Sequence, residues 1–401
     1  MYRVPRLSAL LALCLLLALM LSGSGPSATA PVVQGSAAVA SETAAGGSNA
    51  AGLLPVLIGF TKAPGAAEEG LVRGASGKIK YTYHIIPAIA ARLPAQAVAA
   101  LAHNPRVAYI EEDAIATASA DTVPWGITRV KADLLWAGNT ASGVKVAVID
   151  TGLDYRHPDL APNYKGGYDY VNRDTDPMDD NGHGTHCSGT VAAAVEGTNV
   201  VGAGPGIALY GVKVLNWAGS GSYSDIIAAL QWCVTNGMQV ASMSFGGSRG
   251  STSLQNACAA AYNANVVLVA AAGNSGKANG RGNTVLYPAK YSSVIAVAAI
   301  DSNNVRASWS SSGAEVEIAA PGVSIVSDRL GGGLITYSGT SMACPHVAGC
   351  AALTIASGVT KAATVRNRLD ATALDLGAAG RDALYGYGLV DAQRAVLQAS
   401  P

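Results

Sequence analysis

Charge is scarce in this sequence, and it is balanced. Only 13% of the 401 residues are Asp, Glu, Lys or Arg, and 26 basic residues face 26 acidic ones. An average globular domain has about 25% charged residues. A chain without net charge has no electrostatic attraction for nucleic acid or for an anionic membrane surface, so we expect neither partner. A disordered chain is excluded as well, because 50% of the residues are apolar.

Long apolar runs are missing except for one near the N-terminus. Residues 7–21 are uncharged and almost wholly apolar, follow Arg3 and Arg6, and precede small residues at 22–25. The run is shorter than the ~18–20 residues that span a bilayer. A basic start, an apolar run and small residues are typical of a secretory signal peptide. We predict a signal peptide over residues 1–30, secretion, and no membrane association after maturation, with a retained membrane anchor as the alternative.

Cysteines are few, and their number is odd once the signal peptide has left. Of the six, Cys14 lies in the signal peptide, so at least one of the other five is a free thiol. Cys344 and Cys350 lie on one predicted helix, too far apart along its axis for a disulfide. Cys233 ends one predicted helix and Cys258 lies in the next, so they are the disulfide candidate, with two free thiols as the alternative.

The rest of the chain divides into a tether, a small module and a large one. Residues 31–52 are rich in Ala, Gly and Ser, which is typical of a flexible tether. Residues 53–119 predict a small α+β module that ends in a small, polar, cleavable linker. Its predicted order is β-α-β-α-β, with strands at 54–60, 78–85 and 106–114 and helices at 65–73 and 94–102.

Residues 120–401 alternate short apolar strands with helices. The strands are expected at 144–149, 207–214, 240–243, 266–271 and 294–298. Near-continuous apolar strands indicate a parallel sheet that helices cover on both faces, an α/β fold. Ligands of such sheets gather at the carboxyl ends of the strands, where Asp150 and Asn274 lie.

Three segments supply the side chains of a nucleophilic site. They read VAVIDTG at 146–152, NGHGTH at 181–186 and SGTSMACPH at 338–346. A serine hydroxyl is a weak nucleophile, so Ser341 needs a base, and His183 between two glycines can approach it. Asp150 would fix the tautomer of the imidazole. Taken singly, each residue has a structural alternative: Asp150 would cap a turn, His183 would be a hydrogen-bonded histidine of a turn, and Ser341 would cap a helix.

An oxyanion site is expected beside Ser341. The residues after Ser341 suit a helix N-terminus, whose free N–H groups stabilise a developing oxyanion, and Pro345 is tolerated in a first turn. Asn274 is expected to donate to the same oxyanion. Its structural alternative is a residue that tolerates an unusual backbone φ angle.

These segments closely resemble the three catalytic signatures of the subtilisin-like serine proteases, the subtilases, in that family's order of Asp, His and Ser. In having a cysteine at position 187, the chain resembles the thermitase and proteinase K branches of that family. Residues 53–119 are similar to the family's inhibitory propeptide. The resemblance implies a three-layer subtilisin-like fold after a small ferredoxin-like propeptide. That propeptide would act as intramolecular chaperone and inhibitor and be cut off near Ser119-Ala120.

The resemblance also implies how a peptide substrate binds. Two backbone segments would pair with the extended peptide: Gly219, Ser220 and Gly221, and Ser244, Phe245 and Gly246. The pocket for the residue before the cut would be lined by Ala271, Ala272, Gly273 and Leu286. Because Leu286 stands where many relatives have Gly, we predict a shallow pocket that prefers small or medium side chains.

Calcium is the cofactor that the resemblance implies, with one or two structural ions. One ligand set would be Asp121, Asp159 and Glu196. A second would be Asp169, Asp174 and Asp176, in a loop similar to the thermitase-like calcium loop. Several carboxylates suit Ca²⁺, and the alternative for the second set is a solvated acidic loop.

We therefore predict a secreted, monomeric serine endopeptidase that acts on proteins and peptides. Two alternatives stay open. The first is a catalytically silent binding protein on the same fold. The second is an esterase, although α/β-hydrolases carry Gly-x-Ser-x-Gly and place Asp after Ser.

Overall fold

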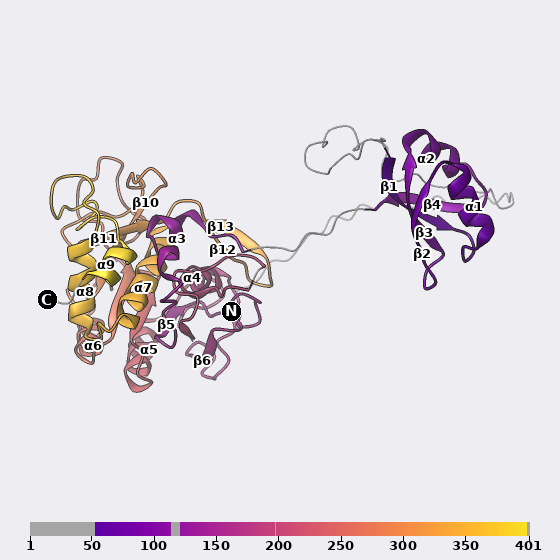
Figure 1. Ribbon diagram of the computed structural model, residues 1–401. Helices are drawn as coiled ribbons and strands as arrows, with labels where there is room; N and C mark the ends of the chain where they lie inside the picture. The colour runs from indigo at the N-terminus through magenta and orange to yellow at the C-terminus, as the bar shows by residue number, and fades with distance from the viewer. Residues whose placement is uncertain (1–52, 114–120, 197, 399–401) are drawn as a thin grey trace, which may run out of the picture. The chain divides into compact units, whose positions relative to one another are not determined.

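The computed structural model describes residues 53–113, 121–196 and 198–398, which form two compact units (Figure 1). The small unit comprises residues 53–113 and the large unit residues 121–398. The predicted signal peptide, tether and processing site lie outside the described residues. Among the helices that are described, none is long and apolar enough to cross a membrane.

The small unit is an antiparallel sheet with two helices. Its elements are β1 (Leu53–Phe60), α1 (Ala66–Gly74), β2 (Lys78–Thr82), β3 (Ala88–Pro94), α2 (Ala95–Ala102) and β4 (Val107–Glu112). The strand order β2-β3-β1-β4 is that of a ferredoxin-like fold. Ile58, Val72, Ile89 and Leu93 are fully buried between sheet and helices. The α+β prediction is confirmed.

The predicted order of that unit was wrong by one strand, because β3 was missed and the order is β-α-β-β-α-β. The segment reads AIAARLP, in which three of the seven residues are alanine, a strong helix former. Its first four residues are all buried, so it also lacks the alternation typical of a half-exposed strand.

The large unit is built on a seven-stranded parallel sheet in the order β11-β10-β9-β8-β5-β7-β6. Its strands are β5 (Lys145–Asp150), β6 (Tyr164–Asp169), β7 (Ala208–Lys213), β8 (Val240–Met243), β9 (Val267–Ala271), β10 (Ile295–Ile300) and β11 (Val316–Pro321). A hairpin of β12 (Ile325–Asp328) and β13 (Leu334–Tyr337) follows. All five predicted strands are confirmed. The edge strands β6 and β11 were not predicted, because their YKGGYD and VEIAAP sequences carry glycine, charge or proline.

Helices cover both faces of this sheet, as predicted. They are α3 (Trp125–Arg129), a 3₁₀ turn (Asp133–Leu135), α4 (His183–Ala192), α5 (Tyr223–Thr235), α6 (Thr252–Asn263), α7 (Thr340–Ala356), α8 (Ala362–Thr372) and α9 (Ala392–Leu397). The long α7 lies against the central strands and packs on α4, while α5 and α6 pack together on the other face. Close approach requires glycine here: a Cβ on Gly349 of α7 would lie 2.4 Å from the Cβ of Ala203.

The predicted disulfide is wrong. Helices α5 and α6 do pack against each other, but Cys233 and Cys258 are both free and both fully buried. Burial raises the pKa of each thiol to about 12. Both behave as small apolar core residues.

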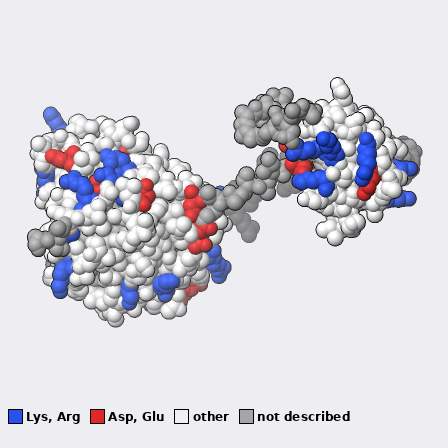
Figure 2. Space-filling view, in the orientation of Figure 1, with Lys and Arg blue, Asp and Glu red and all other residues white. Residues whose placement is uncertain are grey.

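The surface matches the composition. On the face of the large unit that Figure 2 shows, most atoms belong to uncharged residues, and acidic and basic side chains occur in small, separate groups.

Candidate active site

The first pair of candidate residues meets where β5 ends and α4 begins. Asp150 is the last residue of β5 and is fully buried. Its Oδ1 lies 2.7 Å from Nδ1 of His183, the first residue of α4. Burial, the largest single influence, would lower the pKa of His183, but the Asp150 charge, the Cys187 thiol and the hydrogen bonds to both together raise that pKa well above its usual value. The imidazole is thus held with Nδ1–H toward the carboxylate, which leaves the lone pair on Nε2.

A second buried carboxylate fixes the start of α4. Asp179 accepts hydrogen bonds from the backbone N–H groups of Asn181, Gly182 and Thr185, at 2.9–3.0 Å. Burial raises the pKa of Asp179, but the hydrogen bond from the Thr185 hydroxyl, at 2.6 Å, and these backbone bonds together hold it below its usual value. Asp179 also accepts from the Thr151 hydroxyl at 2.9 Å, so one carboxylate links the helix that carries His183 to the residue after Asp150. The sequence analysis did not find this role, although the acidic DDNGH run before the histidine could have suggested a helix cap.

Ser341 is the second residue of α7, and the chain departs here from the prediction for Pro345. The structure places Pro345 in the second turn, where its missing N–H leaves the Ser341 carbonyl without a helical donor. The Ser244 hydroxyl donates to that carbonyl at 2.8 Å, and the Cys187 thiol donates at 3.4 Å. The Ser341 hydroxyl itself donates to the Ser244 carbonyl at 2.9 Å. This hydrogen bond has to break before the hydroxyl can donate to a base.

Cys187 shows that Ser341 and His183 are neighbours. Its Sγ lies 4.0 Å from His183 Nδ1, in addition to its contact with Ser341. The cysteine is fully buried, and burial raises the pKa of its thiol, so it is a packing residue between the two catalytic candidates.

Asn274 is exposed and lies beyond the end of β9, facing the start of α7. Its Oδ1 accepts from the Thr340 N–H at 2.9 Å and from the Thr340 hydroxyl at 3.0 Å. Because an N–H can only donate, the amide oxygen must face Thr340, and Nδ2 points away. The Cβ position of Gly339 lies 3.5 Å from Asn274 Nδ2 and 3.6 Å from the Ser341 nitrogen. Two N–H donors therefore border one small space beside Ser341.

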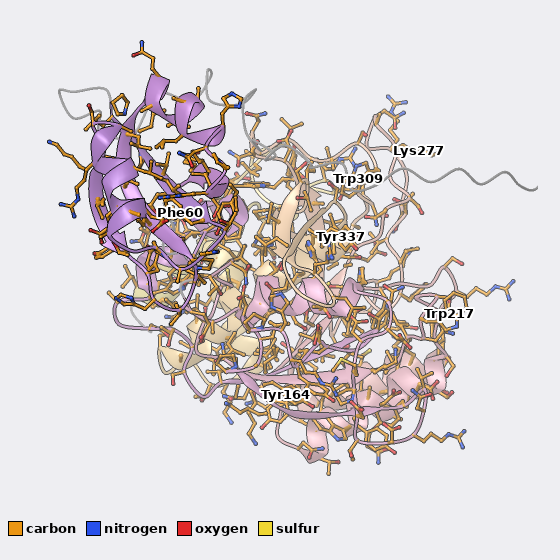
Figure 3. All side chains as sticks on the ribbon, turned by 90° about the vertical axis from the view of Figure 1, so that its right-hand side faces the viewer. Phe60, Tyr164, Trp217, Lys277, Trp309 and Tyr337 are labelled. Carbon is orange, nitrogen blue, oxygen red and sulfur yellow. The ribbon has the colours of Figure 1, made fainter. Side chains whose placement is uncertain are left out.

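Both segments expected to bind substrate backbone adjoin this centre. Ser244 follows β8 and is bonded to Ser341 in both directions, which places Ser244, Phe245 and Gly246 beside the nucleophile. Gly219, Ser220 and Gly221 are exposed in the loop after β7. That loop is tied to the residues before His183, because Asn181 Nδ2 donates to the Trp217 carbonyl at 2.9 Å. The Trp217 side chain is 73% exposed at the edge of the large unit (Figure 3).

Leu286 lies between the two walls of the predicted pocket. A Cβ on Gly246 would come within 2.7 Å of Leu286 Cβ, and a Cβ on Gly273 within 2.7 Å of Leu286 Cγ. The Leu286 N–H donates to the Ala272 carbonyl at 2.9 Å, which fixes its position. Ala271 is a buried residue of β9 on the same wall. The Leu286 side chain thus fills the space between Gly246 and Gly273. A large substrate side chain would need that space.

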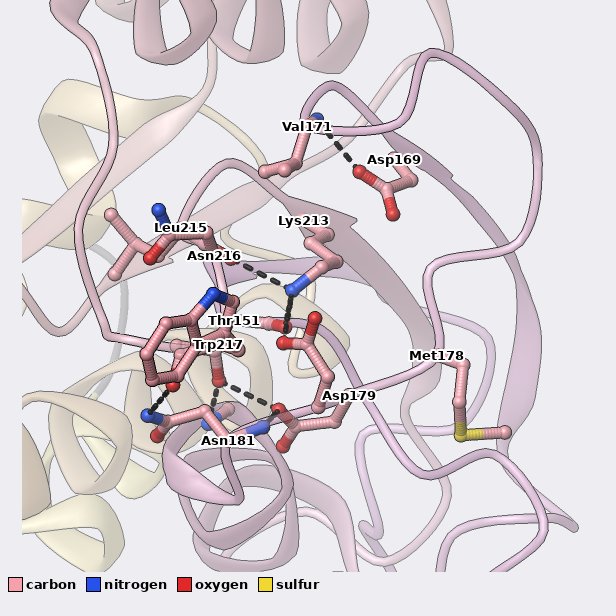
Figure 4. Close-up of polar contacts among 12 residues, drawn as sticks. Thr151, Asp169, Val171, Met178, Asp179, Asn181, Lys213, Leu215, Asn216 and Trp217 are labelled. Atoms are coloured by element: carbon pink, nitrogen blue, oxygen red, sulfur yellow. Dashed lines mark hydrogen bonds and ion pairs between the residues drawn. The ribbon is translucent and has the colours of Figure 1, made fainter.

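A buried lysine that the sequence analysis missed is hydrogen-bonded to the residue that follows Asp150. Lys213 ends β7 and is 1% exposed. Its Nζ donates to the carbonyls of Thr151 and Leu215, at 2.6 and 2.8 Å, and to Asp180 Oδ1 at 2.6 Å (Figure 4). A buried ammonium with three acceptors holds the strand ends that carry Asp150 in place. The apolar segment around it, GVKVL, gave only a strand signal.

Two of the first three predicted metal ligands accept hydrogen bonds from the same residue, Thr198. Asp121 Oδ1 accepts from the Thr198 N–H at 2.8 Å, and Asp159 Oδ1 accepts from the Thr198 hydroxyl at 3.2 Å. Asp159 also accepts from Asn199 and Val200. Glu196 is exposed in the same loop. Asp121, Asp159 and Glu196 do not bring three ligand atoms within 4.8 Å of one another, so side chains alone do not complete this set.

The second predicted set does not fit. Asp169, Asp174 and Asp176 do not bring three ligand atoms within 4.8 Å of one another. Asp169 is buried, and its carboxylate accepts from the backbone N–H groups of Val171 and Asn172 and from the Asn172 amide. Asp176 accepts from the Tyr155 hydroxyl and the Met178 N–H. The carboxylates stabilise their own loop. Asp174 and Asp176 are exposed, as a solvated acidic loop requires, but Asp169 is buried.

Comparison with known proteins decides the family. The model of the subtilase family matches residues 141–388. The chain belongs to the subtilase family. The model of the peptidase inhibitor I9 family matches residues 62–119, which contain most of the small unit.

Several subtilases are similar over most of this chain. Subtilisin amylosacchariticus of Bacillus subtilis subsp. amylosacchariticus is 46% identical over 82% of this chain and 86% of its own length. Subtilisin DY of Bacillus licheniformis is 49% identical over 69% of this chain and 99% of its own length. An alkaline protease of Alkalihalobacillus alcalophilus is 44% identical over 79% of this chain and 81% of its own length. The protein is thus a subtilisin-like serine endopeptidase with an inhibitor-type propeptide.

Proposed function

We propose that this subtilase hydrolyses peptide bonds through an acyl-enzyme on Ser341, with His183 as general base and Asp150 as its positioning partner. The observation that carries the proposal is the 2.7 Å bond between Asp150 Oδ1 and His183 Nδ1, formed from two elements that adjoin the start of α7. Asp150 keeps the proton on Nδ1 and stabilises the imidazolium that forms.

In this mechanism the Ser341 hydroxyl turns from the Ser244 carbonyl toward His183. Its Oγ forms a bond to the carbonyl carbon of the substrate while His183 Nε2 takes the hydroxyl proton. The carbonyl oxygen becomes an oxyanion, which accepts hydrogen bonds from Asn274 Nδ2 and the Ser341 N–H. The C–N bond then breaks, the amine leaves with the proton from His183, and water releases the acyl group by the same steps.

The preference for small or medium residues before the cut is part of the proposal. Leu286 between Gly246 and Gly273 supports it. The residues that precede the proposed processing point, Ala116, Thr117, Ala118 and Ser119, are small as well. They would be the first substrate, when the propeptide is cut near Ser119-Ala120.

The propeptide and the compartment complete the proposal. The inhibitor match supports a role for residues 53–119 as inhibitor and intramolecular chaperone, because a parallel sheet folds slowly and an active protease would cut its own intermediates. The basic and apolar start of the chain supports secretion. Asp121 and Asp159 would hold a structural Ca²⁺ that joins the start of the large unit to the loop around Thr198.

A serine-directed phosphonofluoridate tests the central assignment. It should form one adduct, on Ser341, and abolish peptide hydrolysis in proportion to labelling. Peptide hydrolysis that persists after complete labelling would refute Ser341 as the nucleophile.

A further inference from the structure

Trp217 is an exposed aromatic side chain that the proposed mechanism does not use. It is 73% exposed, whereas the other four tryptophans of the chain are partly buried and pack against the core of the large unit. Tryptophan buries most of its surface on average in folded proteins. It is also enriched among the residues that carry most of the binding energy at interfaces. An indole left in solvent therefore suggests a contact residue for a partner molecule.

The turn that carries Trp217 is closed by its own hydrogen bonds. The Asn216 side-chain oxygen accepts from the N–H groups of Ala218 and Ser220, at 3.0 and 3.2 Å. The Gly219 N–H donates to the Asn216 carbonyl at 2.8 Å, and the Asn216 N–H donates to the Ser220 carbonyl at 2.9 Å. Gly219 has a φ of +72°, which glycine adopts without strain. The backbone of Trp217 is thus ordered before a ligand arrives, which reduces the entropy cost of binding.

This turn lies beside the start of the helix that carries His183. Asn181 Nδ2 donates to the Trp217 carbonyl at 2.9 Å (Figure 4). Its Oδ1 accepts from the His183 N–H at 3.1 Å. A Cβ on Gly219 would lie 3.9 Å from the same Nδ2. One side chain, Asn181, therefore separates the Trp217 turn from the proposed general base.

The loop also offers unpaired backbone groups to an extended peptide. Gly221 is exposed, and its N–H and C=O have no hydrogen-bond partner within the described part of the chain. Gly246, after β8, is exposed and unpaired in the same way. A Cβ on Gly221 would lie 2.1 Å from the Val214 carbonyl oxygen, so only glycine lets the loop lie against the end of β7. Exposed backbone edges of this kind take up an extended peptide as an added strand.

The sheet order places Trp217 on the side away from the predicted pocket. The pocket segments follow β8 and β9, whereas the Trp217 turn follows β7, and β5 lies between β8 and β7. Side chains of an extended peptide point alternately to opposite faces. When the residue before the cut enters the pocket at Leu286, the side chain of the second residue before the cut points away from that pocket. It then faces the turn of Trp217.

We propose that Trp217 is a specificity-determining residue, which contacts the side chain of the second residue before the cut and favours an aliphatic one there. This inference rests on the proposed peptidase function. The side chains bonded to the turn, Asn181 and Asn216, carry no charge, and the neighbouring Asp180 is already paired with Lys213. An aliphatic side chain laid on the indole removes apolar surface from water, whereas a hydroxyl gains no partner from it.

The test uses two peptide p-nitroanilides that differ only in the second residue before the cut, acetyl-Ala-Ala-Leu-Ala and acetyl-Ala-Ala-Ser-Ala. The quantity compared is the ratio of their kcat/KM values. We expect the Leu to Ser ratio to fall about 10-fold in Trp217→Ala, and Trp217→Phe should keep most of it because phenylalanine restores an aromatic face. Leu134→Ala is the matched control, since Leu134 is 58% exposed in the 3₁₀ turn, and it should leave the ratio unchanged.

The second readout needs no hydrolysis. The product-like peptide acetyl-Ala-Ala-Leu-Ala, with a free carboxylate, is titrated into the purified protein while tryptophan emission is recorded. Emission should shift to shorter wavelength as the indole leaves water, and the shift should be absent in Trp217→Phe, whose other tryptophans are unchanged. The same titration with the Ser peptide should require about 10-fold higher concentration for half saturation.

The outcomes separate this inference from the peptidase proposal. Hydrolysis of both p-nitroanilides with an equal Leu to Ser ratio in the parent and in Trp217→Ala would overturn the inference and leave the peptidase proposal standing. No hydrolysis by the parent, together with an emission shift that Trp217→Phe abolishes, would refute the peptidase and support the contact. No emission shift on peptide addition would overturn the contact with Trp217 in either case.

Discussion

Replacement of Lys213 by methionine tests whether a buried cation holds the aspartate end of the active site in place. Methionine fills a similar volume but donates no hydrogen bond. The change leaves the buried carbonyls of Thr151 and Leu215 without the Nζ donor, while Asp180, whose side chain is 46% exposed, can turn to water. Each buried acceptor left unpaired costs about 1–3 kcal/mol. We expect a total loss of about 2–4 kcal/mol in the free energy of unfolding, partly offset by the lysine's own desolvation cost.

The assay is thermal unfolding in the Ser341→Ala background, with kcat measured on the active enzyme well below its Tm. At about 2 °C per kcal/mol for a unit of this size, Tm should fall by about 4–8 °C. The matched control is Lys165→Met, because that exposed lysine makes one local contact, with the Pro162 carbonyl, and its loss should move Tm by less than about 1 °C. Equal Tm values for Lys213→Met and the parent, with kcat unchanged, would refute the reasoning.

Two further predictions concern catalysis. Because the Asp150 charge raises the pKa of His183 and only the neutral imidazole can act as base, kcat/KM should fall as the pH drops through an apparent pKa above 6.5. In Asp150→Asn that limb should move to lower pH and kcat should fall by about 10⁴-fold, and a pH profile that does not shift would contradict the pairing. Leu286→Ala should raise kcat/KM for peptides with Phe before the cut, relative to Ala there, by about 10–100-fold. Leu374→Ala, an exposed leucine, is its control, and an unchanged ratio in Leu286→Ala would show that Leu286 does not limit the pocket.

The sequence predicted the site better than it predicted the supporting structure. Asp150, His183, Ser341 and Asn274 lie in short motifs whose order is informative, and the five predicted strands are mostly apolar. The strand β3 was missed because its alanines have no strand propensity. Lys213 was missed for another reason: a lone charged residue in an apolar strand gives no sign of which distant groups it will meet. Thr151 and Leu215 become partners of Lys213 only when the strands are assembled.

The pairing of Cys233 with Cys258 failed for a similar reason. Neighbouring helices were predicted correctly, but adjacency of helices does not bring two sulfur atoms into bonding geometry. The acidic loop at residues 169–176 is a second case in which composition was not enough. Its carboxylates suit a cation, but the backbone N–H groups of the loop donate hydrogen bonds to the buried carboxylate of Asp169.

The most direct test of the central claim is the intact mass of the purified protein, as wild type and as Ser341→Ala, each treated with a phosphonofluoridate. If Ser341 is the nucleophile of a self-processing protease, the wild type should be a shortened chain that begins near Ala120 and carries one adduct, while Ser341→Ala keeps residues 53–119 and stays unlabelled. If the wild type also keeps the propeptide and takes no label, the site is silent and the account is wrong.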